Sequence, residues 1–240
     1  MTLLHDGELS AAFDHAARRY DLLTAVNPGY RADLRRSARR LRLPGGGRGL
    51  RLLDLGCGTG ASTAALLATA PHAEIVAVDA SAGMLERAAA KPWPPGVSFV
   101  HAPAEELAGV GGGFDAVFAA YLFRNVTDPD AVLAAVRTAL EPGGRLAVHE
   151  YTLSGSAAHR AVWTAVCRGI VLPAGRLAGD GGLYRHLWRS VLAFDTVPEF
   201  TARLRRTGFR QVRALPLPGW QTGITHTVVA AAPDARQETP

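Results

Sequence analysis

Leu52-Leu53-Asp54-Leu55-Gly56-Cys57-Gly58-Thr59-Gly60 is the stretch of sequence that decides the fold. An apolar run ends there in an acidic residue and three alternate glycines, and the helix-compatible segment 61–68 follows. This order predicts a buried strand, a tight glycine loop and a helix. Because glycine has no side chain, such a loop lets a ligand approach the backbone and meet the helix N-terminus.

Strands and helices alternate on either side of this loop. Near-continuous apolar strands in such an alternation are typical of a parallel sheet that helices cover on both faces. The sequence therefore predicts an α/β, doubly wound, mostly parallel sheet. The expected strands are 51–55, 74–79, 97–101, 114–120 and 144–150, and the expected helices are 60–70, 81–90 (capped by Ser81) and 129–140.

The segments outside this core are accessory elements of a single domain. Two helices are expected between residues 8 and 43, with a break at Asn27-Pro28-Gly29. Helices at 156–172 and 182–194, separated by glycine-rich 174–181, predict a roof over the strand ends. A helix at 196–206 and an antiparallel hairpin of strands 209–215 and 224–230 follow. The predicted divisions are N-terminal helices 1–45, cofactor-binding core 48–151, helical lid 152–195, C-terminal helix and hairpin 196–231, and a flexible tail 232–240.

The composition fits a globular protein, since 48% of the 240 residues are hydrophobic. The first residues lack a basic segment leading into an apolar one, and no apolar run approaches the ~20 residues of a membrane span, so we expect a cytoplasmic protein. Cys57 and Cys167 offer neither a disulfide framework nor the paired spacing of a metal site, and no metal is expected.

Arginine carries nearly all of the positive charge, because Lys91 is the only lysine. Six arginines fall between Arg31 and Arg42, where they form a face that could bind phosphates. No aromatic residues interleave them, so nucleic acid is not expected as a partner. A solvated helix face and a peripheral membrane contact remain open, as does the choice between monomer and homodimer.

The glycine loop is compatible with two cofactors. Gly56, Gly58 and Ala61, with Asp79 about 20 residues further on, fit the loose dinucleotide fingerprint of an NAD-dependent oxidoreductase. Asp54 precedes the glycines, so its carboxylate should emerge at the mouth of the loop, where it would repel a pyrophosphate and pair with an ammonium. A ligand with a ribose at one end and an amino-acid ammonium near the loop is S-adenosylmethionine.

Residues 53–60 are also similar to the first motif of class I methyltransferases. More narrowly, four segments resemble the ubiquinone and menaquinone C-methyltransferase family: 13–21 (FDHAARRYD), 124–128 (RNVTD), 140–146 (LEPGGRL) and 184–187 (YRHL). The resemblance implies a seven-stranded sheet with an antiparallel last strand. It also implies S-adenosylmethionine as methyl donor and a ring carbon of a quinol or phenol as acceptor.

The donor site that follows from the loop and the resemblance includes residues from several strand ends. One departure from the family is Pro103, which stands where an acidic or amide residue usually reaches the adenine, so adenine recognition should rest on backbone groups near Ala104 and on Met84. The expected cofactor-binding residues are Tyr20, Asp54, Gly56, Cys57, Gly58, Gly60, Asp79, Ala80, Met84, Ala104, Glu105 and Tyr121.

Carbon methylation needs an electron-rich ring, so a base or a phenolate-stabilising cation is expected near the ends of the fourth and fifth strands. The expected catalytic residues are Arg124, Asn125 and Glu150, and Arg124, Tyr151, Tyr184 and His186 are expected to contact the acceptor. Strand alternation sends His149 and Glu150 to opposite faces, so at most one should face the site.

Other interpretations stay open. Glu150 could instead tie down the roof, and Arg124 and Asn125 could stabilise their own loop. The alternatives for function are oxygen methylation of a small natural product, an NAD-dependent oxidoreductase, and a methyltransferase-fold scaffold without catalysis.

Overall fold

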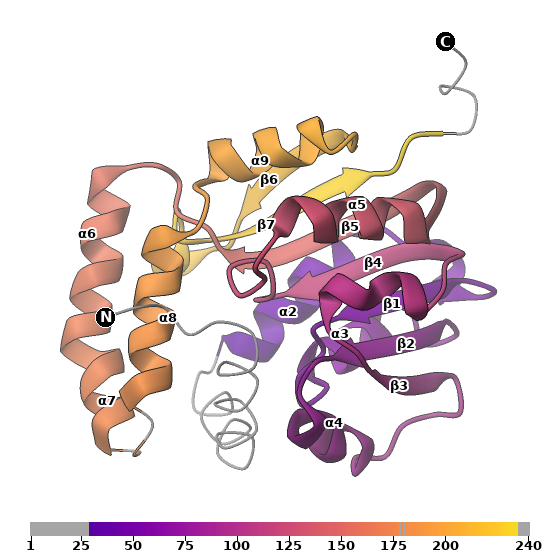
Figure 1. Ribbon diagram of the computed structural model, residues 1–240, viewed down its shortest axis with the longest axis horizontal. Coiled ribbons are helices and arrows are strands. Elements are labelled where there is room, and N and C mark those ends of the chain that lie inside the picture. Colours follow the sequence, from indigo (N-terminus) through magenta and orange to yellow (C-terminus); the bar gives the residue numbers. More distant parts are fainter. Residues whose placement is uncertain (1–28, 178, 180, 235–240) are drawn as a thin grey trace.

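The computed structural model describes residues 29–177, 179 and 181–234, and these form a seven-stranded sheet flanked by helices (Figure 1). The strand order is β3-β2-β1-β4-β5-β7-β6. β7 runs antiparallel to β5 and β6, while β3, β2, β1, β4 and β5 are mutually parallel. The predicted doubly wound fold is confirmed. The strands are β1 (Arg51–Leu55), β2 (Glu74–Asp79), β3 (Val97–His101), β4 (Phe114–Ala120), β5 (Leu140–Tyr151), β6 (Arg210–Pro216) and β7 (Thr225–Ala231).

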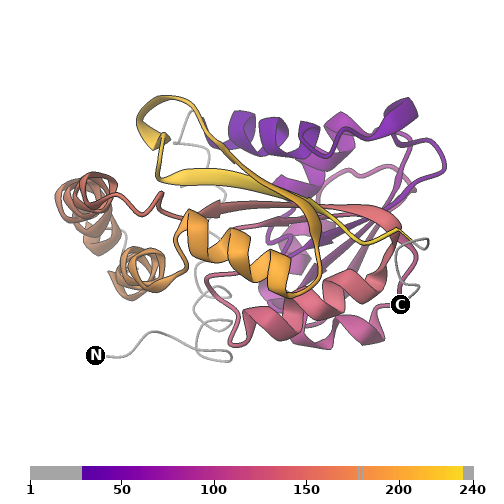
Figure 2. The same ribbon diagram turned by 90° about the horizontal axis from the view of Figure 1, so that it is seen from above.

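Helices cover both faces of this sheet (Figure 2). On one face α2 and α3 bury Leu34 and Leu66 with Leu52 of β1, and on the other α5 and α9 bury Val136 and Phe200 in the cluster that contains Leu53. Alternate residues of β1 thus serve opposite cores. The helices are α2 (Tyr30–Arg39), η1 (Pro44–Gly47), α3 (Ala61–Thr69), α4 (Ala82–Ala89), η2 (Ala104–Gly109), α5 (Pro129–Ala139), α9 (Val197–Arg206), η4 (Gly219–Gln221) and the lid helices given below.

Several helices begin where the sequence carries a cap. Ser81 accepts a hydrogen bond from Met84 N at 3.1 Å, as expected, and Asp128 accepts one from Ala131 N at 3.0 Å. At α9, Thr196 and Glu199 form a capping box. Each cap satisfies backbone N–H groups that the first turn of a helix leaves without partners.

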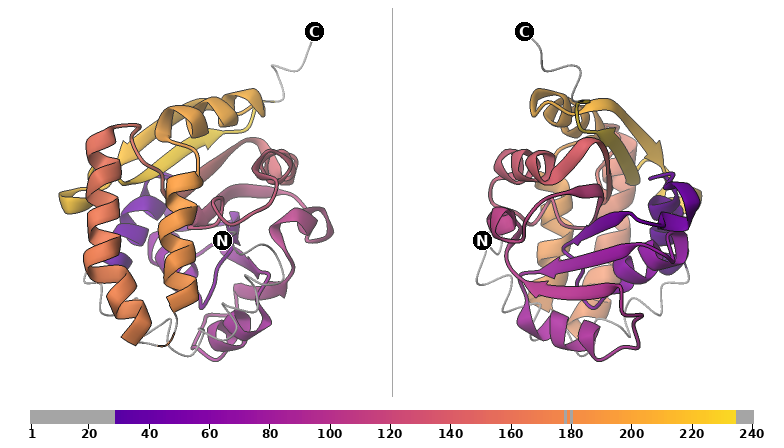
Figure 3. Two further views of the ribbon diagram at one scale, coloured as in Figure 1. Left: turned by 60° about the vertical axis from the view of Figure 1, so that its left-hand side comes forward. Right: turned by 90° about the vertical axis from the view of Figure 1, so that its right-hand side faces the viewer.

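The lid consists of α6 (Ala157–Val166), the π-helical turn η3 (Cys167–Val171), α7 (Leu172–Leu177) and α8 (Gly181–Ala193). The helices α6 and α8 run side by side beyond the ends of the strands (Figure 3). The expected break at 174 is wrong, since the first arm continues to Leu177. Gly175 is a packing position rather than a loop residue, because a Cβ there would lie 2.5 Å from the ring of Tyr184.

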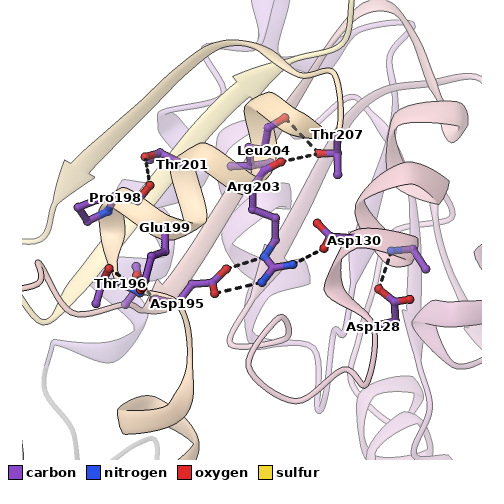
Figure 4. Close-up of polar contacts among 12 residues, drawn as sticks. Asp128, Asp130, Asp195, Thr196, Pro198, Glu199, Thr201, Arg203, Leu204 and Thr207 are labelled. Atoms are coloured by element: carbon purple, nitrogen blue, oxygen red, sulfur yellow. Dashed lines mark hydrogen bonds and ion pairs between the residues drawn. The ribbon is translucent and has the colours of Figure 1, made fainter.

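Arg203 of α9 fastens the end of the lid to the core (Figure 4). Its Nε lies 2.5 Å from Oδ2 of Asp195, which follows α8, and its Nη1 lies 2.5 Å from Oδ2 of Asp130 in the first turn of α5. Both carboxylates hold the pKa of Arg203 above its usual value. Through these two ion pairs, Arg203 joins the end of the lid to α5, the helix that follows the 124–128 loop.

The arginine-rich segment folds as α2 and the turn after it. Arg31, Arg35, Arg36 and Arg39 are exposed, whereas Arg40 turns inward and donates to the backbone oxygens of Leu215 (2.7 Å) and Pro216 (2.9 Å). Part of the cationic segment is thus structural. No helix in the described part of the chain is long and apolar enough to cross a membrane.

Candidate active site

A cavity of about 540 Å³ opens at the carboxyl ends of β1, β2 and β4. This edge is where ligands bind in doubly wound sheets. The lining residues come from the strand ends and the loops that follow them: Leu55, Gly56, Gly58, Val78, Asp79, Ala80, Ser81, Met84, Ala102, Pro103, Ala104, Glu105, Ala120, Tyr121, Leu122, Arg124, Asn125, Val126 and Thr127.

The glycine loop forms one wall of the cavity. Gly58 has φ of +53°, and a Cβ built on it would have no neighbour within 4 Å, so its missing side chain leaves open space. Gly60 has φ of +90° and lies against Trp93, where a Cβ would come within 2.8 Å of the ring. Gly58 therefore gives a ligand access to the backbone, whereas Gly60 allows close packing beneath the loop.

Asp79 ends β2 and lines the cavity beside Gly58. Its Oδ2 accepts a hydrogen bond from Gly58 N at 2.7 Å and its Oδ1 accepts one from Ser81 N at 2.9 Å. These bonds fix the carboxylate between the glycine loop and the start of α4. Each oxygen has two lone pairs, so a carboxylate held this way can still accept from a ligand hydroxyl.

Asp54 lies beneath the loop instead of at its mouth. The side chain is fully buried, and its Oδ2 accepts from Thr63 Oγ1 at 2.6 Å and Ser62 Oγ at 2.8 Å. Its Oδ1 has no hydrogen-bond partner among the residues that the structure describes. Burial raises the pKa of Asp54 to about 7, against the lowering by the two hydroxyls. The expected exposure at the mouth is therefore wrong, and the carboxylate retains one unsatisfied oxygen.

Tyr121 follows β4 in an unusual backbone conformation, with φ of +58°. Its amide donates to His149 O at 2.8 Å, and its carbonyl oxygen accepts from Arg124 Nη1 (2.8 Å) and Asn125 Nδ2 (3.0 Å). A left-handed aromatic residue is strained and persists only where its surroundings fix it. The hydrogen bonds of the Tyr121 amide and carbonyl groups therefore hold this wall of the cavity in place.

Arg124 forms a buried ion pair with Glu150. Its Nη1 lies 2.6 Å from Oε1 of Glu150, and the exposed fractions of the two side chains are 8% and 0%. Tyr151 N also donates to this oxygen, at 2.8 Å. Burial raises the pKa of Glu150, while the guanidinium of Arg124 opposes the shift. Arg124 lines the cavity and Glu150 does not, so Glu150 reaches the site through Arg124.

His149 and Glu150 each contact a different residue of the cavity wall. His149 Nε2 lies 2.8 Å from the hydroxyl oxygen of Tyr121, while Glu150 holds Arg124. Neither side chain lines the cavity, in keeping with the expectation that at most one of them would face the site. Strand alternation sends the two side chains to opposite faces, and on each face the side chain meets a wall residue.

Of the four residues expected to contact the acceptor, Arg124 lines the cavity and the other three pack elsewhere. Tyr151 packs between Tyr121 and Trp163 of the lid, with ring centroids 4.8 and 5.0 Å apart. His186 Nε2 lies 3.1 Å from Asn125 Oδ1, which joins α8 to the 124–128 loop. Tyr184 packs on Gly175 within the lid. None of these three is among the residues that line the described cavity.

The structure brings most of the expected donor residues together. Tyr20 lies outside the described residues. Asp54 lies beneath the loop, and neither it nor the loop residues Cys57 and Gly60 line the cavity. Sequence reasoning missed the apolar lining positions Leu55, Val78 and Leu122 because they look like ordinary strand residues. The expected residues that do line it are Gly56, Gly58, Asp79, Ala80, Met84, Ala104, Glu105, Tyr121, Arg124 and Asn125.

Comparison with known proteins bears on this geometry. Residues 1–228 match the model of the ubiE/COQ5 methyltransferase family. The chain belongs to this family. It is accordingly an S-adenosylmethionine-dependent methyltransferase, as the glycine loop and the four sequence segments predicted.

Individual relatives of the ubiE/COQ5 family agree in length as well as sequence. The ubiquinone/menaquinone biosynthesis C-methyltransferase UbiE of Syntrophotalea carbinolica is 34% identical over 212 residues, covering 86% of this chain and 88% of that protein. The demethylmenaquinone methyltransferase of Thermus thermophilus is 37% identical over 201 residues, covering 82% and 90%. The crystal structure of a SAM-dependent methyltransferase from Thermotoga maritima superposes with a TM-score of 0.66 at 19% identity, covering 93% and 99%, and so shares the fold.

Proposed function

We propose that this methyltransferase methylates a ring carbon of a hydrophobic quinol or phenol, with the donor and the reacting ring meeting in the cavity at the ends of β1, β2 and β4. The observation that carries the proposal is the cation of Arg124 in the cavity wall, held by the buried carboxylate of Glu150. The names of the two relatives, a quinone-biosynthesis C-methyltransferase and a demethylmenaquinone methyltransferase, support the same acceptor class.

The residues present fit S-adenosylmethionine. Asp79 is a fixed acceptor for ribose hydroxyls, and the apolar side chains of Val78, Met84 and Leu122 suit an adenine ring. The unsatisfied Oδ1 of Asp54 lies beneath the loop and outside the cavity lining, so the carboxylate would act on the amino-acid ammonium from behind the glycine loop. When bound, the donor supplies an electrophilic methyl group on a sulfonium.

The protein's part in the reaction is to align the acceptor and to favour its ionised form. A guanidinium beside a phenolic oxygen lowers the pKa of the phenol, which makes the ring carbon next to that oxygen more nucleophilic. We assign this role to Arg124. When the ring carbon gains the methyl group it loses its hydrogen as a proton, and the ring becomes aromatic again.

Asn125 and Glu150 have supporting roles in this proposal. Asn125 carries its amide between Tyr121 O and His186, so it fixes the loop and the lid at the cavity edge. Glu150 keeps Arg124 in place and balances its charge, and we therefore assign Glu150 as a positioning residue. Tyr184 and His186 belong to the lid, and Tyr151 at the end of β5 packs on Trp163 of the lid, so these residues would then shape the cover over the acceptor.

Labelled donor and an acceptor panel test the proposal. Purified protein is incubated with methyl-deuterated S-adenosylmethionine and, in turn, demethylmenaquinol, simple phenols or catechols, and the products are analysed by mass spectrometry. Label in the quinol supports the proposal, and label confined to an oxygen of a catechol or phenol would overturn it. Ala104→Trp fills the cavity wall and should abolish transfer, whereas Ala134→Trp, on an exposed position of α5, is the matched control.

A further inference from the structure

A network of buried hydrogen bonds links α2, β7 and β5 to Tyr121 in the cavity wall. Ser37 of α2 lies 2.7 Å from His149 Nδ1 and 2.6 Å from the hydroxyl of Thr227 on β7. Arg40 Nη1 donates to the Thr227 hydroxyl at 2.7 Å, and His149 Nε2 lies 2.8 Å from the Tyr121 hydroxyl. Ser37, His149 and Thr227 are fully buried.

The hydrogen bonds run along the α2 face of the sheet, from Thr227 on β7 past His149 on β5 to Tyr121 after β4. The helix α2 lies along one face of the sheet, while the lid lies beyond the strand ends (Figure 2). Arg40 at the end of α2 is partly exposed, and Tyr121 lines the cavity. The hydrogen bonds therefore run from the protein surface to the wall of the candidate active site.

Because Arg40 can only donate hydrogen bonds, the donor and the acceptor of each bond in this network can be assigned. A guanidinium can only donate, so the oxygen of Thr227 accepts from Arg40. Thr227 has one other side-chain contact in the described structure, Ser37, and its buried hydroxyl hydrogen must therefore point there. By the same reasoning Ser37 donates to His149 Nδ1, which leaves Nε2–H to donate to the oxygen of Tyr121.

Tyr121 completes the series as a donor. Burial is the main cause that holds the pKa of Tyr121 well above its usual value, with the neighbouring Tyr151 adding to it, so the phenol stays protonated. Since its oxygen accepts from His149, its hydroxyl hydrogen is left to point to the side chain of Tyr151. Every group from Arg40 to Tyr121 therefore has one assigned donor role and one assigned acceptor role, apart from the guanidinium, which only donates. A satisfied buried network of this kind favours one arrangement of its members, because any reversal would leave a buried hydrogen without an acceptor.

We propose that His149 is a positioning residue of the methyltransferase site, which acts through Tyr121 and is itself oriented by Ser37, Thr227 and Arg40. The imidazole holds the hydroxyl end of a side chain whose backbone is left-handed, at φ of +58°, and whose ring lies 5.4 Å from the guanidinium carbon of Arg124. The network thus fixes the ring that forms the wall between the glycine loop and Arg124.

The neutral state of the imidazole agrees with this assignment. Burial, together with the positive charges of Arg40 and Arg124, lowers the pKa of His149 to about 3. The groups that face it are Ser37 from α2, Arg40 directly after α2, Thr227 from β7, Tyr121 after β4, and Arg124. A histidine in these surroundings stays neutral, so it serves as a fixed donor and acceptor rather than as an acid or base.

The function of the network is tested by a double-mutant cycle on Ser37→Ala and Tyr121→Phe. Ser37 lies outside the cavity, so a change in ligand binding on its substitution has to pass through His149 and Tyr121. Isothermal titration with S-adenosylmethionine and with S-adenosylhomocysteine gives the dissociation constants, and thermal unfolding gives the stability. Thr201→Val on α9, which removes another buried hydroxyl, is the matched control.

We expect Ser37→Ala to raise the donor dissociation constant about fivefold, the scale of one net hydrogen bond, and to add little in the Tyr121→Phe background. Effects that add in the double variant, or a loss of stability with unchanged binding in both single variants, would overturn the proposal. Binding requires no acceptor, so an absence of methyl transfer, which would count against the proposed function, does not affect this test.

Nitrogen-15 NMR of histidine-labelled protein tests the direction of these hydrogen bonds without any substitution at the cavity. The assigned arrangement predicts that His149 is neutral with its proton on Nε2 from pH 5 to 8. A His149 signal that titrates near the ordinary histidine pKa of ~6.5, or a proton on Nδ1, would contradict it. Assignment of the signal among the eight histidines comes from comparison with His149→Gln.

Discussion

Replacing Glu150 by glutamine isolates the charge of the buried pair with Arg124. Glutamine keeps the size of the side chain and an oxygen that can accept from Tyr151 N. In the parent protein Tyr151 N lies 2.8 Å from Glu150 Oε1. It removes the negative charge that lies 2.6 Å from a guanidinium whose side chain is only 8% exposed. The variant therefore leaves a buried cation without its counter-charge.

The expected loss of stability is about 3 kcal/mol, at the lower end of the range for removing one partner of a buried ion pair, because the acceptor oxygen is retained. For a domain of this size that corresponds to a decrease in Tm of roughly 6 to 12 °C. Arg124→Met/Glu150→Gln should lose less than the sum of the single variants, because no uncompensated charge remains.

Urea denaturation and thermal unfolding measure these changes in the ligand-free protein. Glu74→Gln is the matched control, because Glu74 pairs with Arg51 at 3.2 Å on the surface, with side chains 58% and 36% exposed. That substitution should cost between 0 and about 1 kcal/mol. Equal effects of the two substitutions would refute the reasoning, as would a Glu150→Gln variant as stable as the parent protein.

Three further predictions concern the donor and the lid. Burial raises the pKa of Asp54 from 3.8 to about 7, so the folded protein holds this proton more tightly than the unfolded chain. The free energy of unfolding should therefore decrease as the pH rises from 3.8 to about 7. Urea denaturation at several pH values in this range should show a smaller decrease for Asp54→Asn, and parallel profiles for the two proteins would contradict the assignment. Asp79→Asn should weaken S-adenosylmethionine binding about tenfold in calorimetry, the scale of a charged hydrogen bond, and unchanged binding would exclude its role with the ribose. Arg203→Met should raise the acceptor KM several-fold in steady-state assays and leave the donor dissociation constant unchanged, because it frees the lid and not the glycine loop; a change confined to the donor would count against this.

Much of the fold could be predicted from the sequence, because the strands carry strong apolar patterns and the helices carry clear caps. Residues 51–55, 74–79, 97–101 and 114–120 are strands with the bounds expected. The break expected in the lid at Gly175 failed for a physical reason. Glycine in a helix interior resembles a loop signal in sequence, whereas here it accommodates the ring of Tyr184.

The site could be predicted less completely. Asp79 and the loop glycines follow from local order along the chain, so their positions could be anticipated. Asp54 was expected at the mouth of the loop, yet strand alternation points it beneath α3, toward Ser62 and Thr63. The partnership of Ser37 with His149 depends on how α2 packs across the sheet, and no local pattern signals contacts between residues so far apart in sequence.

The central claim is methyl transfer to a ring carbon in the cavity beside Arg124. The most direct measurement uses donor with a carbon-13 methyl group and demethylmenaquinol, with the product examined by NMR. The account predicts a labelled methyl resonance on a quinone ring carbon, much reduced in Arg124→Met. A resonance from a methyl on oxygen, or carbon methylation that proceeds equally well without Arg124, would contradict it.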